Sequence, residues 1–214
     1  MSKFCYKPWL DESDQQEVLF CSIHLYGEER FYPCSGQESE EDRRNNIINI
    51  TMTPVGPGPW DQVTRAKLTA AKREAYCRQA SDEFRSKVSS LLLPQLRAFL
   101  PDLLIISAGF DAHYDDYYHF LSEEDIHWLT AELCEAVEAN PNSLGVISIL
   151  EGGYSLESKV CEKPAKPGRT TKNSKTSPGE SVDPHTMFAQ LPGDGGLVKG
   201  VLAHVAALSG RKHW

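Results

Sequence analysis

Three features are missing from this chain of 214 residues, and each absence excludes a class of protein. No apolar run reaches the roughly 20 residues of a membrane-spanning helix, and the first residues lack the apolar core of a secretory signal. The formal net charge is -8, which gives no overall electrostatic footprint for nucleic acid. The six cysteines include no Cys-x-x-Cys pair, so they predict neither a zinc ribbon nor a disulfide framework. We therefore expect a nuclear or cytoplasmic protein with reduced thiols, no membrane contact and no sequence-specific binding of nucleic acid.

The remaining sequence is patterned as an α/β domain. Short apolar runs predict strands over 18–23, 46–52, 103–107 and 144–150. Helical spacing of apolar residues predicts helices over 61–79, 81–99, the stretch after Ser122 and about 195–209, with a kink at Pro94. The order strand, helix, strand from 84 to 150 indicates parallel strands. Because Leu103–Ile106 is continuously apolar, we expect helices on both faces of a mostly parallel sheet, in three layers.

Two side chains follow strands of this predicted sheet and are candidates for chemistry. Asp111 comes after the third strand, and a carboxylate in a pocket needs a partner such as a divalent metal. His113 lies two residues on, a spacing that zinc ligands can use, although an aspartate at a strand end is more often a turn former or helix cap. Tyr154 follows Gly152-Gly153, and its phenol could donate to an oxyanion or simply be a partly buried tyrosine.

The residues around these two positions resemble the zinc-dependent histone deacetylase family. Two signature motifs are similar, Ser107-Ala108-Gly109-Phe110-Asp111-Ala112-His113 and Leu150-Glu151-Gly152-Gly153-Tyr154. Supporting similarity lies in Leu19-Phe20-Cys21-Ser22-Ile23-His24, in Phe31-Tyr32-Pro33-Cys34-Ser35-Gly36, and from Leu93-Pro94 to Pro101-Asp102. The match is close to the class II and bacterial acetylpolyamine amidohydrolase-like branches, and it implies the arginase/deacetylase type of fold.

The resemblance also implies roles for individual residues. Asp111 corresponds to a zinc ligand, and Tyr154 corresponds to the catalytic tyrosine that polarises the acetyl carbonyl and stabilises the oxyanion. Tyr32 corresponds to a wall of the acetyl-lysine tunnel, and Gly152 and Gly153 to residues beside the substrate. Ser22 and the carbonyl of Ile23 match positions that hold a structural monovalent cation, K⁺. His113 matches no ligand and is expected to pack or hydrogen-bond beside the site.

The implied activity is hydrolysis of the acetyl-lysine amide in histone or other protein tails, with one Zn²⁺ as cofactor. Acetylated tails and a corepressor-type complex would be the partners. Two departures from the family pattern stand out. The run Tyr114-Asp115-Asp116-Tyr117-Tyr118-His119-Phe120 replaces the usual Gly-Asp-Pro-Leu-Gly-Gly, and the chain contains neither a His-His pair nor the strand with the Asp-x-His ligands.

We therefore expect the C-terminal part of a catalytic domain, incomplete on its N-terminal side. Its predicted divisions are an irregular segment 1–16, the catalytic part 17–158, a disordered basic insertion 159–186 and a C-terminal helix within 187–214. The insertion is a solvated loop or a contact for nucleic acid, chromatin or an acidic partner. Two alternatives to a protein deacetylase remain: an inactive remnant or interaction subunit, and an amidohydrolase for acetylpolyamines or other small molecules.

Overall fold

All four expected strands are present in a computed structural model of the protein, which describes residues 13–26, 36, 46–58, 61–156 and 195–210. In chain order its elements are α1 (Asp14–Glu17), β1 (Phe20–Leu25), β2 (Ile47–Met52), α2 (Gln62–Ala66), α3 (Ala70–Lys87), η3 (Val88–Leu92), α4 (Leu93–Phe99), β3 (Leu103–Ala108), α5 (Glu123–Glu138), β4 (Gly145–Leu150) and α7 (Gly196–Ser209). The short helix α1 begins inside the segment expected to be irregular. The expected insertion 159–186 and Tyr32 lie outside the described residues.

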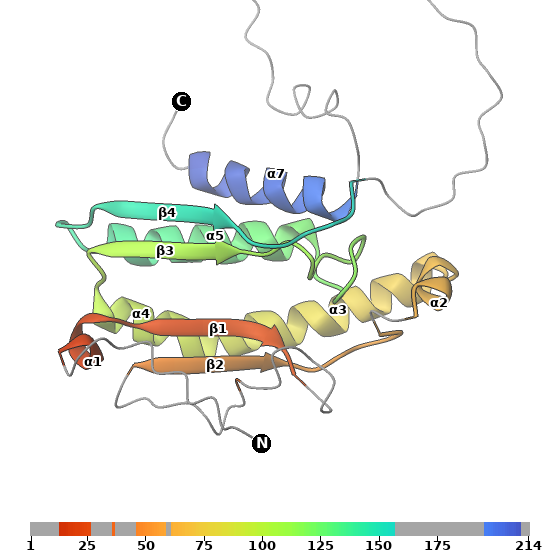
Figure 1. Cartoon of the computed structure of the whole chain (residues 1–214), viewed down its shortest axis with the longest axis horizontal. Coiled ribbons are helices and arrows are strands. Elements are labelled where there is room, and N and C mark those ends of the chain that lie inside the picture. Colours follow the sequence, from red (N-terminus) through yellow and green to blue (C-terminus); the bar gives the residue numbers. More distant parts are fainter. Residues whose placement is uncertain (1–12, 27–35, 37–45, 59–60, 157–194, 211–214) are drawn as a thin grey trace, which may run out of the picture.

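The strands of the described part form two parallel pairs. The strand–helix–strand order had predicted the parallel arrangement of β3 and β4. β1 pairs with β2 from Phe20↔Ile47 to Leu25↔Met52, and β3 pairs with β4 from Leu103↔Gly145 to Ala108↔Leu150. Figure 1 shows α5 behind the β3–β4 pair, α7 alongside β4, and the long rod of α3 and α4 close to β1 and β2. Parallel pairing places the carboxyl ends of β3 and β4 at the same edge of their sheet.

Residues 70–99 form one helical rod where two separate helices were expected. The rod passes through a π-helical turn, η3, immediately before Pro94. A proline has no backbone N–H and its ring crowds the carbonyl four residues earlier, so a local widening of the helix accommodates Pro94 without ending the helix. The rod ends at Leu100, whose φ of 51° gives the left-handed conformation that terminates helices.

Helix α5 begins where the sequence predicted. Ser122 accepts a hydrogen bond from the backbone N–H of Asp125, and the Asp125 side chain accepts one from the N–H of Ser122. This reciprocal capping box satisfies two backbone donors that the first helical turn leaves free. Asp125 is fully buried and also accepts from Ser81 Oγ at 2.6 Å and Arg85 Nε at 2.8 Å. The N-terminus of α5 is therefore fastened to α3.

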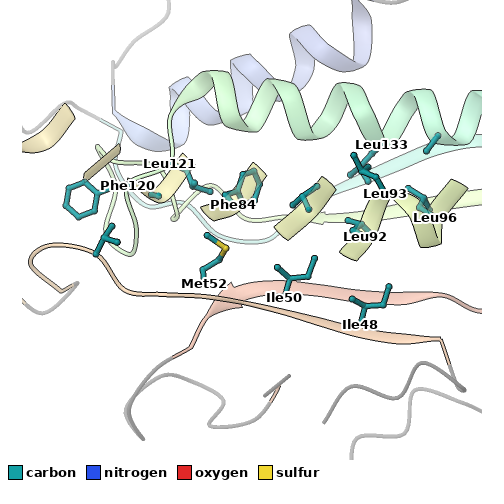
Figure 2. Packing of buried hydrophobic residues seen from close by; sticks show 14 residues of the cluster. Ile48, Ile50, Met52, Phe84, Leu92, Leu93, Leu96, Phe120, Leu121 and Leu133 are labelled. Carbon is teal, nitrogen blue, oxygen red and sulfur yellow. The ribbon is translucent and has the colours of Figure 1, made fainter. Parts of the chain in front are cut away.

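The hydrophobic core lies between β2, the helical rod and α5 (Figure 2). Its fully or nearly fully buried members include Ile48, Ile50, Met52, Phe84, Val88, Leu92, Leu93, Leu96, Phe120, Leu121 and Leu133. Four of them, spaced as the helical pattern predicted, come from one face of the rod. Leu104 and Ile106 of β3 pack against the same cluster. The core thus joins one face of each strand pair to the helical rod.

The other face of the β3–β4 pair is open in the described part of the chain. Ile105 is 58% exposed, and Ile147 and Ile149 are each 48% exposed. Within the described residues, packed elements meet the face of β3 that carries Leu104 and Ile106. Among the described helices, none is long and apolar enough to cross a membrane.

Candidate active site

Asp111 lies in the loop that leaves β3, and its side chain is close to two glycines, Gly109 and Gly152. A Cβ at Gly152 would meet the Asp111 carboxylate at 3.4–3.5 Å, and Gly152 has a φ of 113°, which disfavours any other residue. The loop is tied to the end of β4 by Phe110 N–H, which donates to the Gly152 carbonyl at 3.2 Å. The two motifs singled out in the sequence are therefore in direct contact.

Partial burial raises the pKa of the Asp111 carboxyl above its usual range. Hydrogen bonds from the backbone at Asp111 and Ala112 oppose this effect, while the negative charge of Asp116 adds to it. A carboxylate that is desolvated and close to a second carboxylate gains from a cation beside it. This environment is consistent with a metal-binding oxygen at Asp111.

Tyr154 lies just past the end of β4, with 60% of its surface exposed. Its ring is 6.1 Å from the ring of Tyr117, measured between centroids. Its backbone N–H and that of Ser155 donate to Oδ2 of Asp116, at 2.9 and 2.8 Å. The Tyr154 backbone is therefore held while its phenol faces solvent, an arrangement that leaves the phenol O–H able to reach a substrate.

Asp116 is a structural residue of this site that the sequence reasoning did not assign. It is 2% exposed, and it fixes the Tyr154 loop through the two backbone hydrogen bonds. The feature of the sequence that could have pointed to Asp116 is its position in the Tyr114–Phe120 run. That run was interpreted only as a departure from the family pattern. A buried carboxylate is stable when several N–H groups donate to it, and Asp116 has this role.

The neighbouring Asp115 anchors the same loop to two helices. It forms ion pairs with Arg73 of α3 at 3.3 Å and with Lys199 of α7 at 2.5 Å. Burial alone would lower the pKa of Lys199, but the hydrogen bond and charge of Asp115 outweigh it and raise that pKa. The run that differs from the Gly-Asp-Pro-Leu-Gly-Gly pattern thus contains an aspartate whose two ion pairs connect the loop to α3 and to α7.

His113 is fully buried and turned toward protein groups. Its Nδ1 accepts from the N–H of Asp115 at 3.1 Å, and its Nε2 lies 3.3 Å from Oε2 of Glu123. Since Nδ1 accepts, the ring carries its hydrogen on Nε2, which is close to the Glu123 carboxylate but makes no hydrogen bond with it. His113 therefore fits the expected packing and hydrogen-bonding role beside the site.

Gly153 brings the loop against helix α7. Its φ is 107°, and a Cβ there would lie 2.7 Å from Cδ1 of Leu197. Gly152 and Gly153 were expected beside the substrate. Their positive φ values favour glycine at both positions, and Gly153 also packs closely against α7. Their contact with a substrate stays a prediction.

Ser22 and Ile23, the expected cation-binding positions, lie in β1. Ser22 Oγ is 2.8 Å from Nδ1 of His24, and Nε2 of His24 is 2.9 Å from the Gly36 carbonyl. Because a carbonyl can only accept, Nε2 carries the ring hydrogen and the Ser22 hydroxyl donates to Nδ1. The lone pairs of the Ser22 oxygen remain directed away from that bond. A K⁺ site at these residues stays a prediction.

Comparisons with known proteins identify the fold and the family of this chain. The domain in the crystal structure of the HDA15 HD domain superimposes with a TM-score of 0.52 at 20% identity, covering 94% of this chain and 40% of that one. The architecture is therefore that of the arginase/deacetylase fold. A family model described as the histone deacetylase domain matches residues 10–163. The chain belongs to the histone deacetylase family, as the motifs predicted, and is related to hydrolases that remove acetyl groups.

Two curated relatives show how far the similarity extends. Type-2 histone deacetylase 2 of Dictyostelium discoideum is 31% identical over 154 residues, which are 68% of this chain and 8% of the relative. Polyamine deacetylase HDAC10 of Homo sapiens is 29% identical over 147 residues, 68% of this chain and 19% of the relative. The chain thus spans less than a fifth of the length of either protein.

Members of this family are in general zinc-dependent, so the donor set of the chain decides whether it fits the metal. Asp111 offers one oxygen in a suitable environment. Within residues 13–26, 36, 46–58, 61–156 and 195–210, no three His, Cys, Asp or Glu side chains gather closely enough to hold a metal ion. A catalytic zinc takes three protein ligands, so the described residues do not form a complete zinc site.

Proposed function

We propose that this chain contributes to the hydrolysis of acetylated lysine side chains in histone or other protein tails. In this proposal Tyr154 donates a hydrogen bond to the oxyanion that forms from the acetyl carbonyl, and Asp111 supplies one zinc ligand. The observation that carries the proposal is the junction of the two motifs, where Phe110 N–H is bonded to Gly152 O and Asp116 holds the Tyr154 backbone. Family membership supports the reaction class, deacetylation.

The chemistry that this chain supplies is electrostatic. A phenol O–H directed at a developing oxyanion stabilises the transition state more than the ground state, because the negative charge on oxygen grows as the tetrahedral species forms. Asp116 sets the position of the phenol by holding the main chain at Tyr154 and Ser155. The further ligands and the general base come, in this proposal, from residues outside the described part.

The proposed partners are those that the resemblance to the family implies. They are acetylated protein tails as substrates and a corepressor-type complex as the assembly, with one Zn²⁺ and a K⁺ near Ser22 as bound ions. The proposed location is nuclear, cytoplasmic or both. The relative whose name is polyamine deacetylase makes acetylpolyamines a necessary comparison substrate.

The test is complementation. The 214-residue chain is assayed on an acetyl-lysine peptide alone and together with a polypeptide that carries the His-His and Asp-x-His segments of a histone deacetylase. We expect weak zinc binding and no turnover alone, and turnover together. Robust turnover by the chain alone would contradict the incomplete ligand set. A complex that forms, binds zinc and stays inactive on both the peptide and an acetylpolyamine would support the inactive alternative.

Two variants test the proposed roles of Tyr154 and Asp111 in the active complex. Removing one oxyanion donor costs about 10²–10³ in kcat, so Tyr154→Phe should lower kcat by that factor and leave zinc stoichiometry unchanged. Asp111→Asn should lower zinc stoichiometry. Tyr117→Phe is the matched control, because that ring lies beside Tyr154 and has no assigned role. Equal effects of the two tyrosine variants would contradict the role of Tyr154.

A further inference from the structure

A chain of hydrogen bonds outside the Asp111–Tyr154 site links α5, α7 and β4. His204 of α7 is 6% exposed and lies between two hydroxyl groups. Its Nδ1 is 2.8 Å from Thr130 Oγ1, and its Nε2 is 2.7 Å from Ser148 Oγ. Thr130 is buried in α5, whereas Ser148 is an exposed residue of β4. The histidine is therefore buried, and the serine next to it is accessible from solvent.

The donor and acceptor of each hydrogen bond in this series follow from its last acceptor, the Ile126 carbonyl. Thr130 Oγ1 donates its one hydrogen to the Ile126 carbonyl at 2.8 Å. It can then only accept from His204, so we assign the ring hydrogen of His204 to Nδ1. Nε2 is left as an acceptor, and the Ser148 hydroxyl donates to it. The imidazole is thus held in the tautomer that a general base needs.

The surroundings of His204 keep it neutral. Burial lowers the pKa of His204, with no charged group contributing to the shift. The ring packs against Phe110 with 5.6 Å between centroids, and Phe110 also fills the space beside Gly200. A neutral imidazole within 2.7 Å of a serine hydroxyl can take the hydroxyl proton when the oxygen attacks an electrophile.

We propose that Ser148 and His204 form a nucleophilic site, separate from the Asp111–Tyr154 site, which takes the acyl group of an activated ester. In the covalent step Ser148 Oγ bonds to the carbonyl carbon, the ester C–O bond breaks and the alkoxide or phenolate leaves. The hydroxyl proton moves to His204 Nε2, and the resulting imidazolium keeps its Nδ1–H on Thr130. Thr130 is a positioning residue in this step, since its hydroxyl is bonded to the histidine and to the Ile126 carbonyl.

The probe for this step is an alkyl fluorophosphonate, which a base-activated serine attacks at phosphorus with loss of fluoride. We expect the full chain to gain one phosphonyl group, mapped to Ser148 by mass spectrometry. Ser148→Ala should abolish the label. Ser107→Ala is the matched control, because Ser107 is also exposed, lies on the adjacent strand and has no role in the hydrogen-bond chain. It should label as the unchanged protein does.

Variants of the base and its positioning residue complete the test. General-base catalysis typically contributes about 10²–10⁴-fold, so His204→Gln should slow labelling by at least about 100-fold. Thr130→Val should slow it as well, and Thr130→Ser should restore it, which a loss of packing alone would not predict. Circular dichroism confirms that each variant is folded. A folded unchanged protein that takes no label at Ser148, or equal labelling rates with and without His204, would overturn the proposal.

Discussion

Asp125 connects the N-terminus of α5 to α3 through its buried carboxylate. It is 0% exposed and accepts hydrogen bonds from Ser122, Ser81 and Arg85. Asp125→Ala removes the half of the capping box that its side chain supplies and leaves buried donors without an acceptor. We expect a loss of about 2–4 kcal/mol in the free energy of unfolding, measured by urea denaturation. Glu124→Ala, an exposed neighbour in the same turn, should change it by less than about 0.5 kcal/mol.

His119 should make the free energy of unfolding decrease as the pH falls. It is 2% exposed, and burial lowers its pKa from 6.5 to about 4. Between these two pH values the unfolded chain binds a proton that the folded chain excludes, so stability falls as the pH drops from about 6.5 to about 4. The difference in pKa corresponds to about 3 kcal/mol.

The measurement is the free energy of unfolding as a function of pH for three proteins. His119→Leu should flatten the curve between pH 6.5 and 4 relative to the unchanged protein. Some slope should remain, because burial also lowers the pKa of His204. His127→Gln, at an exposed position of α5, should retain the full slope. Curves of the same slope for the unchanged protein and His119→Leu would refute the assignment.

At the scale of elements, the sequence predicted which helices and strands exist better than it predicted where one helix ends and the next begins. The four strands, the capping box at Ser122 and the apolar face of the rod are as expected, because each depends on residues close in sequence. The junction at residue 80 was wrong. Ala80 has the highest intrinsic helix propensity and no Gly or Pro lies near it, so the local sequence favours a continuous helix. The complete burial of Ala80 against the core fits the uninterrupted helix α3.

Helix α7 depends on a glycine for its close approach to the active-site loop. A Cβ at Gly200 would lie 2.7–2.9 Å from three atoms of Phe110. Gly200→Ala gains about 1 kcal/mol of helix propensity but forces the helix away from the loop, an overpacking that costs about 1–3 kcal/mol. We expect a net loss of stability of about 1 kcal/mol in urea denaturation. Val205→Ala, on an exposed part of the same helix, should be close to neutral. A stabilised Gly200→Ala variant would show that α7 does not press on Phe110.

At the scale of the whole molecule, the site could be only partly predicted. Asp111 and Tyr154 were recognisable because each follows a strand inside a conspicuous motif. Asp115 and Asp116 were not assigned, since their partners Arg73, Lys199 and the Tyr154 backbone come from distant parts of the chain. The sequence also could not show which elements cover the β3–β4 pair, because an apolar strand does not indicate what packs on its second face.

The open face of the β3–β4 pair is the feature that sets how the chain behaves in solution. Exposed Ile105, Ile147 and Ile149 lie together on it, as the register Ile105↔Ile147 requires. A contiguous apolar surface of this kind promotes association and binds apolar dyes. We expect the triple variant Ile105→Thr, Ile147→Thr, Ile149→Thr to scatter less light at high concentration and to bind less anilinonaphthalene sulfonate.

Its stability should change by no more than about 0.5 kcal/mol per site, because exposed side chains contribute little to folding. Ile106→Thr is the matched control: this residue is on the same strand but packs into the core cluster. It should lower the free energy of unfolding by about 1–2 kcal/mol without reducing dye binding by the native state. If the triple variant is destabilised like Ile106→Thr, the face is covered in solution by a part of the chain outside the described residues. If it is stable but still associates, another surface drives association.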